Sequence, residues 1–133
     1  VEKVASGGEL SRFLLALKVC LVKGAKERTL LFDEIDRGVG GSTADAIGRR
    51  LLELSKFGQV ITVTHSPQVA ALASNHYQVA KKMSKSGDIL IQINELTGKP
   101  RIDELARMIS GKIITEEARA AASILLEDGQ EIN

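Results

Sequence analysis

Two neighbouring acids, Asp33 and Glu34, carry the sharpest chemical signal in this sequence, within the segment TLLFDEID. The apolar residues before them predict a short strand buried on both faces. Such a strand delivers both carboxylates to the carboxyl end of an α/β sheet, where these sheets bind ligands. Asp33 suits Mg²⁺, a hard cation that takes one or two carboxylates and keeps several waters. Glu34 could orient or deprotonate an attacking water; the alternative is an ordinary solvated acid pair.

Polar residues also follow a second apolar segment, QVITVTH, which ends in Thr64 and His65. His65 could donate a hydrogen bond to a phosphate oxygen or hold a water. A lone histidine after a strand is more often structural, but two apolar strands that both end in polar groups favour a shared site. Asp36 belongs either to a loop that contacts another protein or to the turn after the first strand.

A third group, Ser6, Gly7 and Gly8, precedes an apolar periodic run that predicts a helix. Glycine lets the backbone approach a ligand closely, and the free N–H groups of a helix start attract an anion such as phosphate. The alternative is a capping box, in which Ser6 caps the helix and Glu9 lies three residues later.

The sequence contains no complete phosphate-binding loop of the form G-x-x-x-x-G-K-[ST]. The nearest imitation is Ser110-Gly111-Lys112, where Ala106 replaces the leading glycine and Ile113 replaces the hydroxyl residue. We therefore expect that this chain does not bind a nucleotide tightly on its own.

The elements that position these groups are predicted from the spacing of apolar residues. Helices are predicted over about 9–23, from 42 or 43 to 56, and over 67–74, 102–109 and 116–126. TLLFDEID and QVITVTH predict two parallel strands joined by a crossover helix, and HYQVAKKM and DILIQINEL predict an antiparallel hairpin. The predicted fold class is therefore α/β. Two parallel strands are few for such a sheet, so we expect others outside this chain.

Composition excludes several classes of protein. The chain has 133 residues, 44% of them hydrophobic, which is enough for one compact domain. The net charge of +1 creates no global field for nucleic acid, and 3% aromatic residues argue against a base-stacking platform. A single cysteine, Cys20, excludes an internal disulfide framework and is consistent with a reducing compartment. No apolar run approaches the roughly 20 residues that cross a bilayer, so we expect no membrane partner.

Lys81, Lys82 and Lys85 gather near the predicted hairpin turn. We favour a solvated edge that blocks aggregation. The alternative is a patch that binds DNA or another partner, which would make the chain a non-catalytic interaction module.

Taken in order, SGGE, LLFDEID and VTHSPQV resemble the C-terminal lobe of an ABC-type ATPase head, and SGGE favours the SMC-like branch of that family. The resemblance implies that residues 1–133 form a single lobe of a P-loop NTPase, with parallel strands, flanking helices and a hairpin. It also implies that the phosphate loop (Walker A) lies in an N-terminal lobe of the same protein. The lobe alone is then expected to be inactive.

The resemblance also implies roles for individual residues. Asp33 serves the Mg²⁺ site, Glu34 is the catalytic carboxylate and His65 senses the γ-phosphate. Asp36 lies in a loop that crosses to the partner head. The signature motif binds the γ-phosphate of an ATP held by the opposite protomer; it consists of Ser6, Gly7, Gly8 and Glu9.

The function implied by the resemblance is ATP hydrolysis between two dimerised heads during DNA double-strand-break repair and recombination. ATP and Mg²⁺ are the implied cofactors. The implied partners are the N-terminal lobe, a second identical head and, through the full-length protein, DNA. The implied location is cytoplasmic and nucleoid-associated. The alternative within the family is another ABC- or SMC-type ATPase, of which a transporter ATPase is disfavoured by SGGE.

Overall fold

A computed structural model of the protein describes residues 29–84 and 86–132. The predicted helix over 9–23 lies outside these residues. The chain divides into two compact units between Leu72 and Ala73, and each unit is described by itself. The prediction of a single lobe over residues 1–133 stays a prediction.

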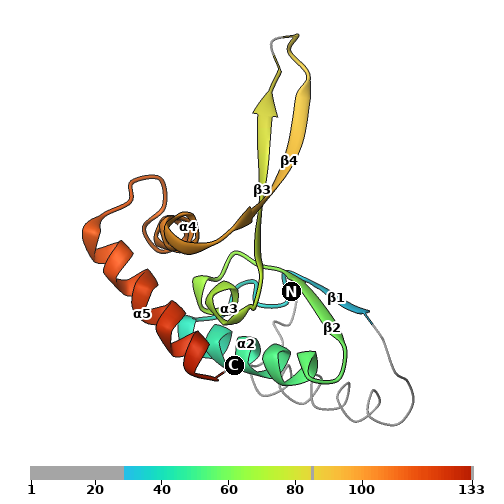
Figure 1. Ribbon diagram of the computed structural model, residues 1–133, viewed down its shortest axis with the longest axis vertical. Helices are drawn as coiled ribbons and strands as arrows, with labels where there is room; N and C mark the ends of the chain where they lie inside the picture. Colours follow the sequence, from blue (N-terminus) through green and yellow to red (C-terminus); the bar gives the residue numbers. More distant parts are fainter. Residues whose placement is uncertain (1–28, 85, 133) are drawn as a thin grey trace, which may run out of the picture. The chain divides into compact units, whose positions relative to one another are not determined.

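The first unit contains the predicted parallel strand pair (Figure 1). Strand β1 (Thr29–Asp33) pairs with β2 (Gln59–Val63), in a register that runs from Thr29 opposite Gln59 to Asp33 opposite Val63. Helix α2 (Gly41–Ser55) makes the crossover, and helix α3 (Pro67–Leu72) follows β2. The parallel pair with its crossover helix confirms the α/β prediction.

The core of this unit lies on one face of the strand pair. Helix α2 packs against β2 and α3. The buried apolar side chains come from β1, α2 and α3: Phe32, Ala44, Ile47, Leu51, Leu54 and Val69. The prediction that the strands are buried on both faces was wrong for the described residues, because Leu31 is 70% exposed and Ile61 is 46% exposed. Apolar runs such as these are typical of strands with helices packed on both faces of the sheet. In the described residues, α2 and α3 belong to one buried cluster, so one face of the strand pair is covered.

Helices α2 and α3 approach each other closely at Gly48. A Cβ atom built there would lie 2.6 Å from Leu72 Cδ1 and 3.3 Å from Val69 Cα. Only a residue without a side chain fits this contact without a shift of its neighbours.

The second unit begins with the predicted hairpin (Figure 1). Strands β3 (His76–Met83) and β4 (Ile89–Leu96) are antiparallel, and their register runs from His76 opposite Leu96 to Met83 opposite Ile89. The turn is closed by backbone hydrogen bonds, among them the one from Ser84 N to Asp88 O at 2.8 Å. Gly87 takes a positive φ of 89°, which glycine adopts without strain.

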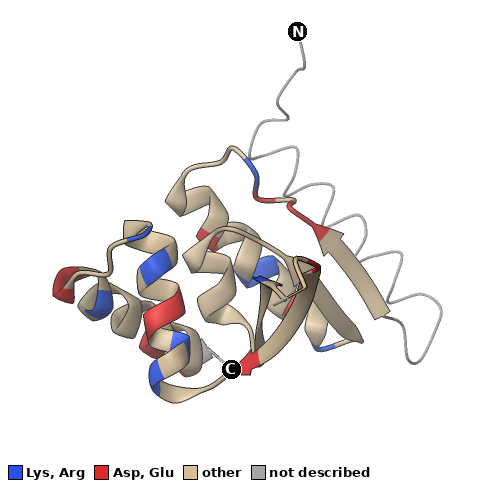
Figure 2. Ribbon diagram, turned by 90° about the horizontal axis from the view of Figure 1, so that it is seen from above, with Lys and Arg blue, Asp and Glu red and all other residues tan. Residues whose placement is uncertain are grey.

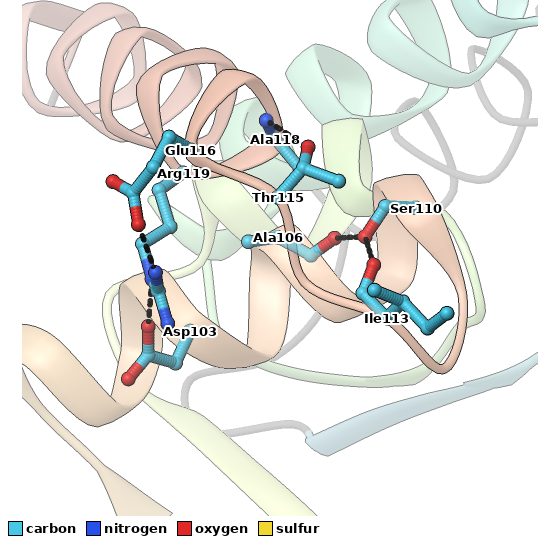
Figure 3. A network of polar contacts seen from close by, with 8 residues as sticks. All are labelled: Asp103, Ala106, Ser110, Ile113, Thr115, Glu116, Ala118 and Arg119. Carbon is cyan, nitrogen blue, oxygen red and sulfur yellow. Dashed lines mark hydrogen bonds and ion pairs between the residues drawn. The ribbon is translucent and has the colours of Figure 1, made fainter.

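Two packed helices complete the second unit, α4 (Gly98–Ser110) and α5 (Glu116–Ile132). Figure 3 shows the polar contacts at their junction. Ser110 Oγ lies 2.9 Å from Ala106 O and 2.7 Å from Ile113 O, and Arg119 Nε donates to Asp103 Oδ1 at 2.8 Å. Thr115 Oγ1 accepts from Ala118 N at 3.2 Å, which confirms the predicted start of α5.

Candidate functional site

The carboxyl ends of β1 and β2 lie at the same edge of the sheet. Asp33 and Val63, the last residues of the two strands, face each other in the register. The backbone N–H of Glu34 donates to Val63 O at 2.9 Å, which continues the pairing one residue beyond β1. Figure 2 shows acidic residues at the end of β1 and in the loop that follows. The sheet thus places the residues after β1 beside those after β2.

Glu34 has an unusual backbone conformation. Its φ of 47° lies in the left-handed region, and it is the single non-glycine residue with positive φ in the described part of the chain. Such a conformation costs on the order of 1–3 kcal/mol and persists where surrounding contacts impose it. Here the bond to Val63 O fixes the residue at the strand end. The left-handed conformation of Glu34 turns the chain sharply after β1.

The Glu34 carboxylate contacts two basic side chains. His65 Nε2 lies 2.8 Å from Glu34 Oε1, and Arg37 Nη1 lies 3.6 Å from Glu34 Oε2. The Glu34 side chain is 32% exposed, whereas that of His65 is 86% exposed. The histidine can therefore orient the carboxylate through Nε2–H and still face solvent or a ligand. The Arg37 contact is longer and belongs to an exposed side chain.

Asp36 lies deeper than its neighbours and is bonded within the chain. It is 7% exposed, and its Oδ2 accepts a hydrogen bond from Thr64 Oγ1. The same Thr64 oxygen accepts from Ser66 N at 2.9 Å. This relay, Ser66 N to Thr64 to Asp36, ties the loop after β1 to the loop after β2. The proposal that Asp36 reaches a partner head stays untested, but its carboxylate faces into its own unit.

An open pocket of about 280 Å³ lies at this sheet edge. Its polar lining comes from the two loops and the first turn of α3: Glu34, Asp36, Arg37, His65, Ser66 and Gln68. Glycines and small apolar residues form the rest of the wall. An open pocket with charged side chains in its lining suits a charged ligand whose other side is covered by a further surface.

Asp33 is exposed at the end of β1, directly before the pocket. No group of three or more His, Cys, Asp or Glu side chains that could enclose a metal occurs in the described residues. This donor set fits Mg²⁺, which is usually held by one or two carboxylates, waters and substrate phosphates, rather than by a full protein cage. The acidic residues that line the pocket are Glu34 and Asp36, and the assignment of Asp33 to the Mg²⁺ site stays a prediction.

The other predicted residues divide into two groups. Ser6, Gly7, Gly8 and Glu9 lie outside the described residues, and their roles stay predictions. Lys81 and Lys82 are exposed on β3, but as neighbours in a strand they point to opposite faces, so these two do not form one cationic patch.

Sequence reasoning missed two contacts of the site. Arg37 lies three residues after Glu34, a spacing that can bring a cation to a carboxylate in a turn. Thr64 was noted only as the residue before His65, yet its hydroxyl holds Asp36 across 28 positions of sequence. A hydroxyl residue next to the candidate histidine was the signal available.

Comparison with known proteins gives a consistent answer. No protein-family model matches the chain. It is 48% identical over 126 residues to DNA repair protein RecN of Rickettsia felis, covering 95% of this chain and 23% of that protein. The RecN proteins of Xylella fastidiosa (strain Temecula1) and Mycobacterium leprae are 44% identical over 132 residues and 49% identical over 127 residues. The chain thus spans about a quarter of the length of these relatives.

A solved structure supports the fold. It comes from work on ATP-driven dimerization and DNA-stimulated activation of SMC ATPases, with a TM-score of 0.58 and 19% identity over 83% of this chain and 65% of that one. No helix in the described residues is long and apolar enough to span a bilayer. The chain is therefore RecN-like in sequence over nearly its whole length and has the α/β fold of an SMC-type ATPase.

Proposed function

We propose that this chain supplies the hydrolytic carboxylate, and the residues that position it, to the ATPase site of a RecN-like DNA repair protein. The observation that carries the proposal is the contact of 2.8 Å between His65 Nε2 and Glu34 Oε1. Residues that follow two different strands meet there, at the edge of a parallel sheet where ligands bind. The RecN relatives and the SMC-type fold support ATP as the substrate.

In this proposal Glu34 accepts a proton from, or orients, the attacking water. The left-handed backbone and the His65 contact hold its carboxylate in one orientation, and a fixed base needs no reorganisation at the moment of reaction. Asp33 would hold Mg²⁺, which supplies neutralisation of the charge on the phosphates when bound. His65 retains an exposed ring edge that can contact the γ-phosphate.

The rest of the site must come from other surfaces. The sequence has no phosphate loop, and the pocket is open on one side. We propose that an N-terminal lobe of the same protein supplies that loop, and that the Ser6-Gly7-Gly8-Glu9 motif contacts nucleotide held by a second head. ATP would then join two heads, and hydrolysis would release them. Phosphoryl transfer suits such division because its catalysis is mostly positioning and charge stabilisation.

The proposal is tested by Glu34→Gln in the full-length protein. Loss of a positioned general base typically slows a reaction by about 10²–10⁴-fold, so we expect turnover to fall in that range while ATP binding persists. Heads joined by ATP should then accumulate in gel filtration. Glu127→Gln, at an exposed carboxylate of α5, is the matched control and should leave turnover unchanged. Unchanged turnover in Glu34→Gln would contradict the assignment.

A second experiment tests the division of the site. This chain alone should show no ATPase activity, and mixing it with the separately produced N-terminal lobe should restore activity. Activity of the chain alone would show that the phosphate loop is not required. DNA should be bound only by the longer protein, in keeping with the separation of Lys81 from Lys82 across β3.

A further inference from the structure

Gln68 lies between the two loops of the candidate site, and the proposed function gives it no role. It is the second residue of α3 and lines the pocket. Its Oε1 accepts a hydrogen bond from Ser66 Oγ at 2.8 Å, and Ser66 directly follows His65. On its other side the amide lies against Gly41, the first residue of α2. The Gln68 amide thus contacts the end of the loop after β1 and the end of the loop after β2.

The contact with Gly41 leaves no room for a side chain. A Cβ atom built at Gly41 would lie 3.3 Å from Gln68 Nε2 and 3.8 Å from Gln68 Cδ. Gly41 lies in a helix and does not have a positive φ, so its backbone conformation does not require glycine. The space that a larger residue would need is occupied by the Gln68 amide instead. The start of α2 is therefore fitted closely to Gln68.

Ser66 holds Gln68 from the other side and is itself fully bonded. Its backbone N–H donates to Thr64 Oγ1 at 2.9 Å. Its carbonyl accepts from Ala70 N at 3.1 Å, which closes the first turn of α3. With the hydroxyl bonded to Gln68, all three polar groups of Ser66 have a partner. The residue next to His65 is thus fixed in place, and Gln68 extends from it to the start of α2.

We infer that Gln68 is a positioning residue, whose amide keeps the loop that carries Glu34 and the loop that carries His65 at a fixed separation. The inference rests on the proposed function, in which the 2.8 Å contact between His65 Nε2 and Glu34 Oε1 orients the candidate base. Hydrogen bonds weaken steeply as their geometry departs from the optimum, so a small relative shift of the loops would disturb that contact. Gln68 acts through these two residues and does not bind the nucleotide.

Two substitutions of Gln68 in the full-length protein test this role. Gln68→Ala removes the amide, and we expect kcat to fall at least about tenfold, since a misplacement of about 1 Å can cost about 10²-fold. The KM for ATP should stay unchanged, as expected for a residue that does not bind the substrate. Gln68→Glu keeps the side-chain length and an oxygen that accepts from Ser66, and should restore most of the lost kcat. Gln92→Ala, at an exposed glutamine of β4, is the control and should leave kcat unchanged.

A direct contact of Gln68 with a phosphate would give the opposite pattern. The carboxylate of Gln68→Glu would then repel the nucleotide, and KM would rise in this variant and in Gln68→Ala. A raised KM, an unchanged kcat in Gln68→Ala, or no recovery of kcat in Gln68→Glu would each overturn the inference.

Gly41→Ala keeps the test decisive if Gln68→Ala fails to fold. Alanine suits a helix, and the added Cβ has only to displace the end of the flexible Gln68 side chain. We expect this variant to fold and to lower kcat. In a Gln68→Glu background, the same change should also lower kcat, because a side chain of the same length fills the same space. An unchanged kcat in Gly41→Ala would contradict the positioning role.

Amide hydrogen exchange without ATP gives a measurement that does not depend on hydrolysis. The backbone N–H groups of Glu34, Arg37 and Ala44 are hydrogen-bonded, so peptides spanning 34–44 report on the loop after β1. These peptides should exchange faster in Gln68→Ala than in the unchanged protein, while those from α5 should not change. Equal exchange over 34–44 would overturn the inference. Faster exchange there, together with unchanged turnover in Glu34→Gln, would overturn the proposed function and leave Gln68 as the residue that holds the loops.

Discussion

The Thr64 hydroxyl donates a hydrogen bond to the buried carboxylate of Asp36 and links the two loops that carry His65 and Glu34. Thr64 immediately precedes His65, and Asp36 lies two residues after Glu34. A shift of either loop would therefore stretch this bond and the His65–Glu34 contact together. The Thr64–Asp36 hydrogen bond therefore helps to hold His65 next to Glu34.

We expect Thr64→Val to destabilise the protein by about 1–3 kcal/mol, because it removes the donor to a buried carboxylate while nearly preserving side-chain shape. Thr64→Ser keeps the hydroxyl and should cost clearly less. Urea unfolding of the two variants beside the unchanged protein measures the difference. Equal losses in Val and Ser variants would show that the methyl group, and not the hydrogen bond, stabilises this position.

The orientation of Glu34 by His65 predicts strong coupling between the two side chains in turnover. His65→Ala should lower turnover of the full-length protein, and the Glu34→Gln/His65→Ala double variant should be scarcely slower than Glu34→Gln. Arg37→Ala is the matched comparison. Because Arg37 is exposed and lies 3.6 Å from Glu34, its loss should lower turnover by about fivefold at most. If the fold reduction in turnover of the double variant equals the product of the reductions in the two single variants, the two residues act independently.

Close packing at Gly48 predicts a stability loss where helix propensity alone predicts a gain. Alanine in a helix interior is favoured over glycine by about 1 kcal/mol. Forcing a methyl group into a filled contact costs about 1–3 kcal/mol. Since the new Cβ would lie 2.6 Å from Leu72 Cδ1, we expect Gly48→Ala to lower the free energy of unfolding. In a Leu72→Ala background the same change should cost less, and an equal cost there would rule out the clash.

Much of the fold was predictable because it depends on local pattern. Apolar runs ending in polar residues predicted β1 and β2, and the Ser-Lys-Ser-Gly-Asp turn predicted the hairpin. Boundaries were less accurate. Helix α4 begins at Gly98 and not near 102, because Pro100 is tolerated in a first helical turn and did not mark a break. Helix α5 continues through Gly129, a residue that weakens a helix without ending it.

The part of the site that could be predicted from the sequence is the set of residues that directly follow β1 and β2. The alternation of strands and helices brought Glu34 and His65 to one edge, and the structure shows their contact. The burial of Asp36 depends on a partner 28 positions away, which periodicity does not reveal. The left-handed backbone of Glu34 was likewise not predicted, because glutamate has no local preference for positive φ; in the structure this residue also bonds to Val63 O on the neighbouring strand.

His76 predicts a pH dependence of stability in the second unit. Burial, and to a lesser extent Arg101, lower the pKa of His76, while Glu104 opposes the shift. Its buried Nδ1 has no hydrogen-bond partner in the described residues, so an added proton there would lack an acceptor. The folded state thus favours the neutral ring. Hydrogen bonding from Arg107, above all, lowers the pKa of Glu104, which therefore stays ionised across mildly acidic pH.

Because the folded-state pKa of His76 lies below the ordinary value of about 6.5, the unfolded chain binds more protons in this range. The stability that His76 contributes is full above pH 6.5 and declines as pH falls towards the folded-state pKa. Urea unfolding at pH 7.5 and 5.5 should show a loss at the lower pH that His76→Gln largely removes. His65 is present in both the unchanged protein and His76→Gln, so any contribution it makes to the pH dependence is the same in the two. An undiminished loss in His76→Gln would assign the pH dependence to another group.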